Sequence, residues 1–339
     1  MRKLILVVLA ACTAQPATPT PASTDPVTYP FGPFAVAAHT EVTTDCVQIT
    51  MHNDAPVFVN AVELTTGPGF HHSNWFFVPE HTFAGDDGTY TCTDRDFNEP
   101  VAAIQGGVLF AQSTQAVHEI QQFPAGHVVK IPAHSKIVAQ IHLLNAGDDP
   151  LMLQPTIVVT PIAEADVTTV LAAISFEDQA IGLPPHAQSR FSVECDLGPQ
   201  HQQLFGTAPD FHIFYALAHY HTLGIGLDLE AIKPDGTTAM VYTTKNTVGD
   251  TLGGPIAPAF DMTGYTKLRM SCEYFNPRDA TVGWGNGDQE MCVFLAFSDS
   301  PYNWGGGVTT SDPPGDATAV GNVMTYSHAC TLFANDASH

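Results

Sequence analysis

Short apolar runs, rich in β-branched and aromatic residues and ended by Gly, Pro, Asn or Asp, recur along the chain from residue 35 onward. These runs occupy residues 47–51, 57–64, 136–144, 156–160, 188–193, 211–217, 225–232, 266–274 and 291–297. Helical periodicity is scarce, and the stretch 166–174 is compatible with a short helical turn or another strand. Many short strands separated by turn residues are typical of antiparallel sandwiches, so the pattern predicts an all-β protein. The Gly- and Pro-rich stretch 302–315 is expected to be a surface loop before the last strand.

The length of 339 residues is enough for two domains with separate cores. Two similar segments, at 131–136 and 183–188, each pass from an apolar residue through Pro and His into an expected strand. This similarity predicts two related β-sandwich domains. We place the N-terminal domain at 31–164 and the C-terminal domain at 165–339, with the boundary in the polar stretch near Glu164.

The charge of the chain is strongly negative, with 34 acidic and 11 basic residues and a formal net charge of -23. Nucleic acids and anionic membrane surfaces both need basic patches on a protein partner, so neither is expected to bind here. The acidic residues are scattered rather than clustered, and we interpret the charge as a contribution to solubility.

The N-terminus has the form of an export signal. A basic start, an apolar run and the sequence Leu-Ala-Ala-Cys ending at Cys12 resemble a bacterial lipobox. The resemblance implies a signal peptide at 1–11 and a lipid on the Cys12 sulfur, whereas an ordinary secretory signal with an incidental cysteine is the alternative. Residues 12–30 are rich in Pro, Thr, Ala and Ser and are expected to form a disordered tether. The prediction is an exported protein of the cell envelope, periplasmic or at the cell surface, that contacts the membrane only through its lipid.

Six further cysteines follow, and an even number in an exported chain indicates three disulfides. They are Cys46, Cys92, Cys195, Cys272, Cys292 and Cys330. None of them forms a Cys-x-x-Cys motif, so a structural zinc site or a redox dithiol is not expected. The residues alone leave the pairing open.

Two histidines, His219 and His221, follow the apolar run 211–217 and precede Gly224. On a strand, residues two positions apart face the same side, so two imidazoles lie next to each other at a spacing that suits one metal ion. The alternative is a pair of polar residues on a solvated strand face.

A second set of histidines lies in the N-terminal domain. His71 and His72 are adjacent, so both can reach one metal only if the backbone turns or bulges there. The preceding Gly-Pro-Gly at 67–69 permits such a bulge, and His142 at the end of an apolar strand offers a third imidazole. These three residues predict a three-histidine site.

Met291 opens an apolar run after an acidic stretch. A thioether is a soft ligand, and two imidazoles with a methionine suit copper, Cu(I) in particular, better than zinc. The alternative for Met291 is ordinary core packing.

The motifs in chain order are His71-His72, Gln140-x-His142, His219-x-His221-x-x-Gly224 and Glu290-Met291-Cys292. The interval from His72 to His142 is 70 residues, as is the interval from His221 to Met291. This order and spacing resemble the type II copper, ascorbate-dependent monooxygenases, which include peptidylglycine α-hydroxylating and dopamine β-monooxygenases. The resemblance covers roughly residues 35–335.

The resemblance implies two jelly-roll-like antiparallel sandwiches, each holding one copper ion, that face each other across a solvent-filled cleft. The implied ligands are His71, His72 and His142 for the electron-transfer copper, and His219, His221 and Met291 for the catalytic copper that meets dioxygen and substrate. The family also implies the disulfides Cys46–Cys92 and Cys272–Cys292, which leaves Cys195–Cys330.

The implied reaction is hydroxylation of a C–H bond by O₂, and it needs two electrons besides those from the substrate. Ascorbate or another one-electron reductant would deliver them singly, and two copper ions would each store one. Imidazole ligands suit both oxidation states of copper, and the thioether favours Cu(I).

Three positions depart from the peptide-hydroxylating members of the family. The residues that would hold a substrate carboxylate fall on Leu217, Val293 and Leu295. A carboxylate would lose its bidentate partner and meet apolar walls. We therefore expect no turnover of C-terminal glycine-extended peptides.

These inferences predict a monomeric copper monooxygenase that acts on a small organic substrate with O₂. A non-catalytic envelope copper-binding protein on the same scaffold is the main alternative, and a zinc hydrolase using the three-histidine site is a third. The chain contains no motif of the common hydrolases or nucleotide-binding proteins.

Overall fold

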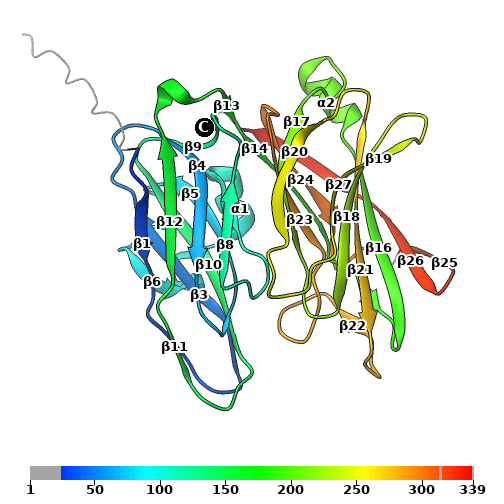
Figure 1. Ribbon diagram of the computed structural model, residues 1–339, viewed down its shortest axis with the longest axis horizontal. Helices are drawn as coiled ribbons and strands as arrows, with labels where there is room; N and C mark the ends of the chain where they lie inside the picture. The colour runs from blue at the N-terminus through cyan, green and yellow to red at the C-terminus, as the bar shows by residue number, and fades with distance from the viewer. Residues whose placement is uncertain (1–23, 313–314, 338–339) are drawn as a thin grey trace, which may run out of the picture.

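Strands supply most of the regular structure in the computed structural model, which describes residues 24–312 and 315–337. They form two β-sandwiches that lie side by side, the N-terminal one in blue to green and the C-terminal one in green to red (Figure 1). The all-β prediction is thereby confirmed. The predicted signal peptide at 1–11, the lipid-anchor residue Cys12 and the part of the predicted tether up to residue 23 lie outside the described residues. The prediction of a disordered tether is wrong for residues 27–30, which form strand β1 and pair with a strand of the first sheet.

The first sandwich has two main sheets and one short strand pair. The strands of one sheet are, in order, β1 (Val27–Pro30), β12 (Thr156–Ile162), β4 (Val57–Thr65), β9 (His127–Ile131) and β13 (Thr169–Val170), with β8 (His118–Gln122) also paired to β4. The facing sheet has the order β6 (Gly88–Thr91), β3 (Thr40–Thr50), β10 (Ser135–Asn145), β5 (Phe70–Pro79) and β7 (Gly107–Ala111). The short pair is β2 (Phe34–Val36) with β11 (Leu151–Leu153), and the 3-10 turn η1 (Cys92–Arg95) and helix α1 (Glu99–Gln105) connect β6 to β7.

The second sandwich has two six-stranded sheets. One has the order β20 (Gly253–Asp261), β17 (His212–His219), β23 (Val293–Ser298), β14 (Ala172–Asp178), β24 (Tyr302–Val308) and β27 (Thr331–Asp336). The other has the order β19 (Thr238–Thr244), β18 (Gly224–Ile232), β21 (Lys267–Asn276), β16 (Ala187–Asp196), β26 (Val323–Ala329) and β25 (Asp316–Val320). A short pair, β15 (Gly182–Leu183) with β22 (Val282–Gly283), and helix α2 (Gly198–Phe205) complete it. The pairs β14–β24 and β16–β26 are parallel, so these sheets are mixed rather than purely antiparallel.

The chain passes between the sandwiches through a short connection. The predicted boundary residue Glu164 opens the 3-10 turn η2 (Glu164–Asp166). The two residues of β13 still pair with β9 of the first sandwich, and β14 is the first strand of the second. None of the described helices is long and apolar enough to cross a bilayer.

The prediction that 302–315 is a surface loop is wrong for its first half, because β24 lies between β14 and β27 inside a sheet. Its glycines permit close packing rather than a turn. A Cβ on Gly305 would lie 2.1 Å from the ring of Phe333, and one on Gly307 would lie 2.3 Å from the carbonyl oxygen of Glu177. Glycine within a strand often marks such a close approach.

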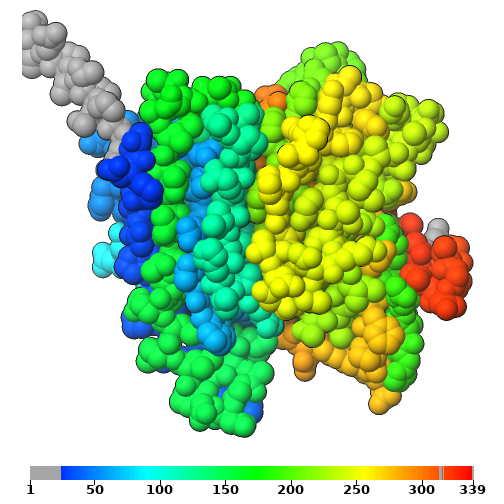
Figure 2. Space-filling view, viewed as in Figure 1, coloured from blue at the N-terminus to red at the C-terminus, as the bar shows by residue number. Residues whose placement is uncertain are grey.

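The two sandwiches share an apolar interface. Phe123 of the first is 2 % exposed, and its ring centroid lies 6.0 Å from that of Tyr215 and 5.0 Å from that of Phe297 in the second. One continuous hydrophobic cluster contains residues from both sandwiches. In Figure 2 the yellow strand β20 lies against the blue-green strand β8 along the seam between them.

Three disulfides tie loops and strands together, as is typical of proteins that fold outside the cytoplasm. The pairs are Cys46–Cys92, Cys195–Cys330 and Cys272–Cys292. They are the pairs that the family resemblance implies.

Candidate metal centre

Two adjacent histidines of β5 reach the same site because the strand bulges at His71. In the pairing of β5 with β10, His72 lies opposite His142 and Phe70 lies opposite Leu143, so His71 has no counterpart across the ladder. A bulge redirects side chains that would otherwise alternate between faces. The ring centroids of His71 and His72 are 5.2 Å apart. The sequence predicts that both histidines can serve one site only with such a distortion, and the distortion is present.

His142 completes the first set. Its ring centroid lies 4.6 Å from that of His71 and 4.8 Å from that of His72. Its Nδ1 is 2.9 Å from Nε2 of His72, and its Nε2 is 2.7 Å from a carboxylate oxygen of Glu41 on β3. The three histidines of the N-terminal domain therefore do converge.

The second set lies where β17 ends. His219 is the last residue of that strand and His221 begins the following turn, with ring centroids 5.4 Å apart. The Glu290 carboxylate holds this turn, since it accepts hydrogen bonds from the backbone N–H groups of His221 at 2.8 Å and Leu223 at 2.6 Å.

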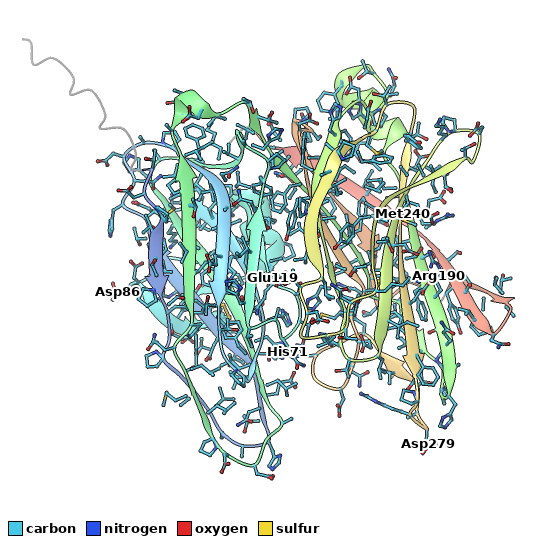
Figure 3. All side chains as sticks on the ribbon, in the orientation of Figure 1. His71, Asp86, Glu119, Arg190, Met240 and Asp279 are labelled. Carbon is cyan, nitrogen blue, oxygen red and sulfur yellow. A yellow bond between two sulfur atoms is a disulfide. The ribbon has the colours of Figure 1, made fainter. Side chains whose placement is uncertain are left out.

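All five histidines form one cluster at the seam between the two sandwiches. Across the domain boundary, the ring centroids of His71 and His221 are 5.0 Å apart and those of His72 and His219 are 4.5 Å apart. Each of the five histidines is buried, and none is more than 9 % exposed. In Figure 3 the labelled His71 lies between the two domains.

This arrangement differs from the expectation of two separate sites across a solvent-filled cleft. The imidazoles that were expected to bind different ions are as close across the boundary as within each domain. The reason is the packing of the domains, because the apolar contacts of Phe123 bring the ends of β5 and β17 together.

The ring nitrogens of the cluster fit a metal ion. Four of them are buried and have no hydrogen-bond partner among the described residues: His71 Nε2, His72 Nδ1, His219 Nε2 and His221 Nε2. One ligand atom each from His71, His72 and His221 lies within 4.8 Å of the others. An unpaired buried polar atom costs about 1–3 kcal/mol, and so many in one place call for an ion or water. The cluster can therefore hold a metal ion.

The other ring nitrogens are held by the surrounding protein. His221 Nδ1 lies 2.9 Å from the carbonyl oxygen of Gln289, and His142 Nε2 faces the carboxylate of Glu41. Both partners only accept, so each ring carries its proton there. This leaves His221 with an unpartnered Nε2, whereas the other nitrogen of His142 accepts from Nε2 of His72. Partners of this kind orient the histidine ligands of metal sites.

Burial keeps the imidazoles of the cluster neutral. Burial, with smaller contributions from the neighbouring imidazoles, lowers the pKa of His71 to about 2 and that of His72 well below its ordinary value. Burial likewise lowers the pKa of His219 to about 3 and lowers the pKa of His221. Burial also lowers the pKa of His142, against the raising effect of Glu41. The rings are therefore neutral at pH 7, as metal ligands must be.

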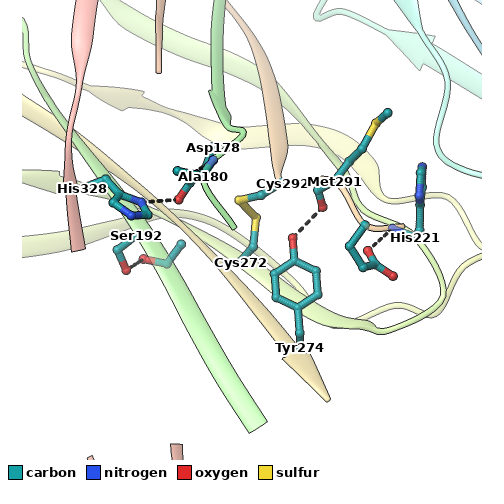
Figure 4. The surroundings of a disulfide bond; sticks show 11 residues. Asp178, Ala180, Ser192, His221, Cys272, Tyr274, Met291, Cys292 and His328 are labelled. Carbon is teal, nitrogen blue, oxygen red and sulfur yellow. Dashed lines mark hydrogen bonds and ion pairs between the residues drawn. A yellow bond between two sulfur atoms is a disulfide. The ribbon is translucent and has the colours of Figure 1, made fainter. Parts of the chain in front are cut away.

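Met291 is half-buried and directly follows Glu290, whose carboxylate accepts from the backbone N–H of His221. The backbone carbonyl of Met291 accepts a hydrogen bond of 2.5 Å from the hydroxyl of Tyr274. Figure 4 shows Met291 and His221 on the same side of the disulfide Cys272–Cys292. The disulfide begins at the next residue, Cys292, and so anchors the backbone on the C-terminal side of Met291.

Two of the three positions expected to line a substrate pocket are covered. Leu217 is 2 % exposed and Leu295 is 5 % exposed, and both belong to the hydrophobic cluster that joins the domains. The half-buried Val293 pairs with His219 at the edge of the histidine cluster.

Several residues of the site carry no signal in the sequence. Thr114 and Gln115 lie in the loop between β7 and β8 and contact His219 and His71. Glu41 is one of 34 acidic residues, and nothing in its local sequence distinguishes it. Only the folded chain brings these residues to the cluster.

Comparisons with known proteins give no family for this chain. No family model matches, and no curated protein matches. Among solved structures, the chain is similar to PNGase F, a glycosylasparaginase from Flavobacterium meningosepticum, with a TM-score of 0.35, 8 % identity and coverage of 91 % of this chain and 99 % of that one. It is also similar to a secreted protein from Parabacteroides distasonis, with a TM-score of 0.21, 9 % identity and coverage of 81 % and 89 %. A third is the PBSX exported protein XepA, with a TM-score of 0.20, 9 % identity and coverage of 80 % and 86 %. These values are too low to carry a functional argument.

Proposed function

We propose that the protein is an extracytoplasmic copper-dependent monooxygenase that hydroxylates a C–H bond of a small organic substrate with O₂. The observation that carries the proposal is the buried cluster of five imidazoles with four unpartnered ring nitrogens. The order and spacing of the motifs, which resemble the ascorbate-dependent copper monooxygenases, support the choice of reaction.

The donor set favours copper over harder metals. Neutral imidazoles suit copper, zinc, iron and nickel, and a thioether favours Cu(I). Magnesium and calcium prefer carboxylate ligands. Among the described residues, the one carboxylate that is hydrogen-bonded to a ring of the cluster is that of Glu41, which contacts His142. His71, His72 and His142 would hold metal from the first domain, and His219, His221 and Met291 from the second.

Bound copper would supply one-electron redox changes, so that two electrons from ascorbate, with two protons, reduce one oxygen atom of O₂ to water while the other enters the C–H bond. The residues of the chain have the remaining tasks. Glu290 keeps the turn at His221 in place, Glu41 and the Gln289 carbonyl keep two rings in the ligand tautomer, and the packed interface excludes water. A buried, dry site strengthens every electrostatic interaction within it.

A non-catalytic copper-binding protein is the second candidate, and one observation favours it. The apolar face around Leu217 and Leu295 is packed against the first domain and leaves no room there for a substrate. A carrier needs only tight copper binding, whereas an enzyme also needs substrate access and reducible copper.

Copper stoichiometry and ascorbate-dependent oxygen consumption separate these functions. The enzyme is expected to bind copper and to consume O₂ with ascorbate in the presence of a suitable substrate, and Met291→Ala is expected to lose this uptake. Met152→Ala is the matched control, because Met152 is 70 % exposed on β11. Tight copper binding without O₂ uptake for any substrate tested would indicate the carrier, and retention of zinc in preference to copper would indicate a zinc protein.

A further inference from the structure

We propose that the loop at 112–116, between β7 and β8 of the first domain, positions metal ligands of both domains. In particular, Thr114 sets the tautomer and orientation of His219 in the second domain so that its Nε2 faces the cluster. The inference rests on the proposed metal-binding function, but its structural part can be tested without metal.

The loop is fixed to its own domain. The backbone N–H of Gln112 donates to the Ser73 carbonyl at 3.0 Å, and its side-chain amide donates to the carbonyl of Ala116 at 2.6 Å. The Glu119 carboxylate accepts from both the hydroxyl and the backbone N–H of Ser113, each at 2.6 Å. The side chains of Gln112 and Ser113 are fully buried, so the loop is part of the packed interior.

The same loop is bonded to the second domain. The carbonyl of Thr114 accepts from the backbone N–H of Gly249 at 3.0 Å, and the Ser113 hydroxyl accepts from that of Leu252 at 2.7 Å. The Thr114 hydroxyl donates to the carbonyl of Tyr220, between the two histidines, at 2.8 Å. Three hydrogen bonds from two adjacent residues thus cross the seam next to the cluster.

These bonds determine which nitrogen of His219 carries the proton. The single hydroxyl proton of Thr114 is used on the Tyr220 carbonyl, so toward Nδ1 of His219, 3.2 Å away, the hydroxyl oxygen can only accept. His219 must therefore be protonated at Nδ1, which leaves a lone pair on the buried, unpartnered Nε2.

Gln115 of the same loop contacts His71. Its backbone N–H donates to the His71 carbonyl at 2.5 Å, and its side-chain amide nitrogen lies 3.4 Å from Nδ1 of the ring. An amide nitrogen only donates, so this contact orients the His71 ring without requiring a proton on Nδ1. Gln115 has a φ of 60°, a left-handed conformation that costs a non-glycine residue about 1–2 kcal/mol. Such strain persists where the surrounding structure requires it, often at functional sites.

The consequence is that the first domain orients a ligand of the second. His219 is held in its ligand tautomer only while the two sandwiches are packed together, because Thr114 comes from the other side of the seam. Packing of the domains and assembly of the site are thus the same event.

The test compares wild type with Thr114→Val, Thr114→Ser and the control Thr82→Val. Valine keeps the shape of threonine but removes the hydroxyl, and serine restores it. Thr82 is also buried and hydrogen-bonded, to Gln105 in the first domain, and contacts no histidine of the cluster. Near-UV circular dichroism verifies that each variant is folded.

Two readouts are measured. In metal-free protein, ¹⁵N shifts of the histidine rings are expected to show His219 protonated at Nδ1 in wild type and a tautomer mixture in Thr114→Val. In a Cu(I) competition titration, Thr114→Val is expected to bind about tenfold more weakly, as is common when a partner of a metal ligand is removed. Thr114→Ser and Thr82→Val are expected to behave like wild type in both.

Unchanged His219 shifts together with unchanged copper affinity in Thr114→Val would overturn the inference. Equal losses in Thr82→Val would also overturn it, because they would show a general packing effect. If wild type binds no copper, the proposed function fails, whereas the ring shifts of the metal-free protein still decide whether Thr114 controls the tautomer.

Discussion

The carboxyl group of Glu119 gives the protein a pH-dependent stability that one substitution should remove. Glu119 is 1 % exposed at the seam between the domains, and burial raises its pKa from 4.5 to about 7, against the lowering effect of hydrogen bonds from Ser113. Glu119→Gln keeps the shape of the side chain and one acceptor for Ser113 but cannot ionise.

The sign of the effect follows from the raised pKa. Between about pH 4.5 and 7 the folded protein binds more protons at this site than the unfolded chain, so its contribution to stability decreases as the pH rises. With these two values, the loss between pH 5.5 and 8.5 is about 2 kcal/mol. The variant lacks this loss, so its stability relative to wild type should rise by about that amount over the same range.

The measurement is urea unfolding of metal-free wild type and Glu119→Gln at pH 5.5, 6.5, 7.5 and 8.5. Other titrating groups, the clustered histidines included, are common to both proteins and cancel in the difference. Glu164→Gln on the exposed turn η2 controls for the removal of one negative charge. Parallel stability curves for wild type and Glu119→Gln would refute the reasoning, because the carboxyl would then not be buried in the folded state.

Three further outcomes are expected. Phe123→Ala should destabilise the protein by about 3–5 kcal/mol in a single urea transition, since Phe123 packs against Tyr215 and Phe297 of the other domain, and two transitions of which only one shifts would show that the domains unfold separately. Replacing Cys272 and Cys292 together by alanine should cost about 3 kcal/mol in the same assay, and an unchanged midpoint would show that this bridge does not stabilise the fold. Mass spectrometry should find no hydroxylation of a C-terminal glycine-extended peptide by wild type. Leu217→Arg should unfold rather than gain that activity, because it places an unpaired charge at a position that is 2 % exposed. Turnover of the peptide by either protein would contradict the claim that position 217 cannot bind a substrate carboxylate.

The local structure around the histidines was predictable from the sequence because it depends on neighbouring residues. The alternation of strand side chains predicts that His219 and His221 lie together, and they do, although β17 ends at His219 and a turn, not the strand, carries His221. The same rule requires a distortion at His71, which the pairing of β5 with β10 contains. Most expected strands are present, for example 136–144 within β10 and 225–232 within β18.

The contact between the histidines of the two domains could not be predicted from neighbouring residues in the sequence. It depends on how two sandwiches pack, and that packing is determined by side chains far apart in the chain, such as Phe123 and Phe297. The role of Thr114 depends on the same contact. The prediction of a loop at the glycines of 305–307 is wrong for a related reason. Glycine is needed both in turns and where strands pack closely, and the sequence does not distinguish the two uses.

The most direct test of the central claim is anomalous diffraction at the copper absorption edge from crystals of the copper-loaded protein. We predict copper at the seam, bound by ring nitrogens of both domains, those of His72 and His219 among them, at about 2.0–2.1 Å from the metal. Copper held by the histidines of one domain only, with those of the other domain out of reach across an open cleft, would contradict it.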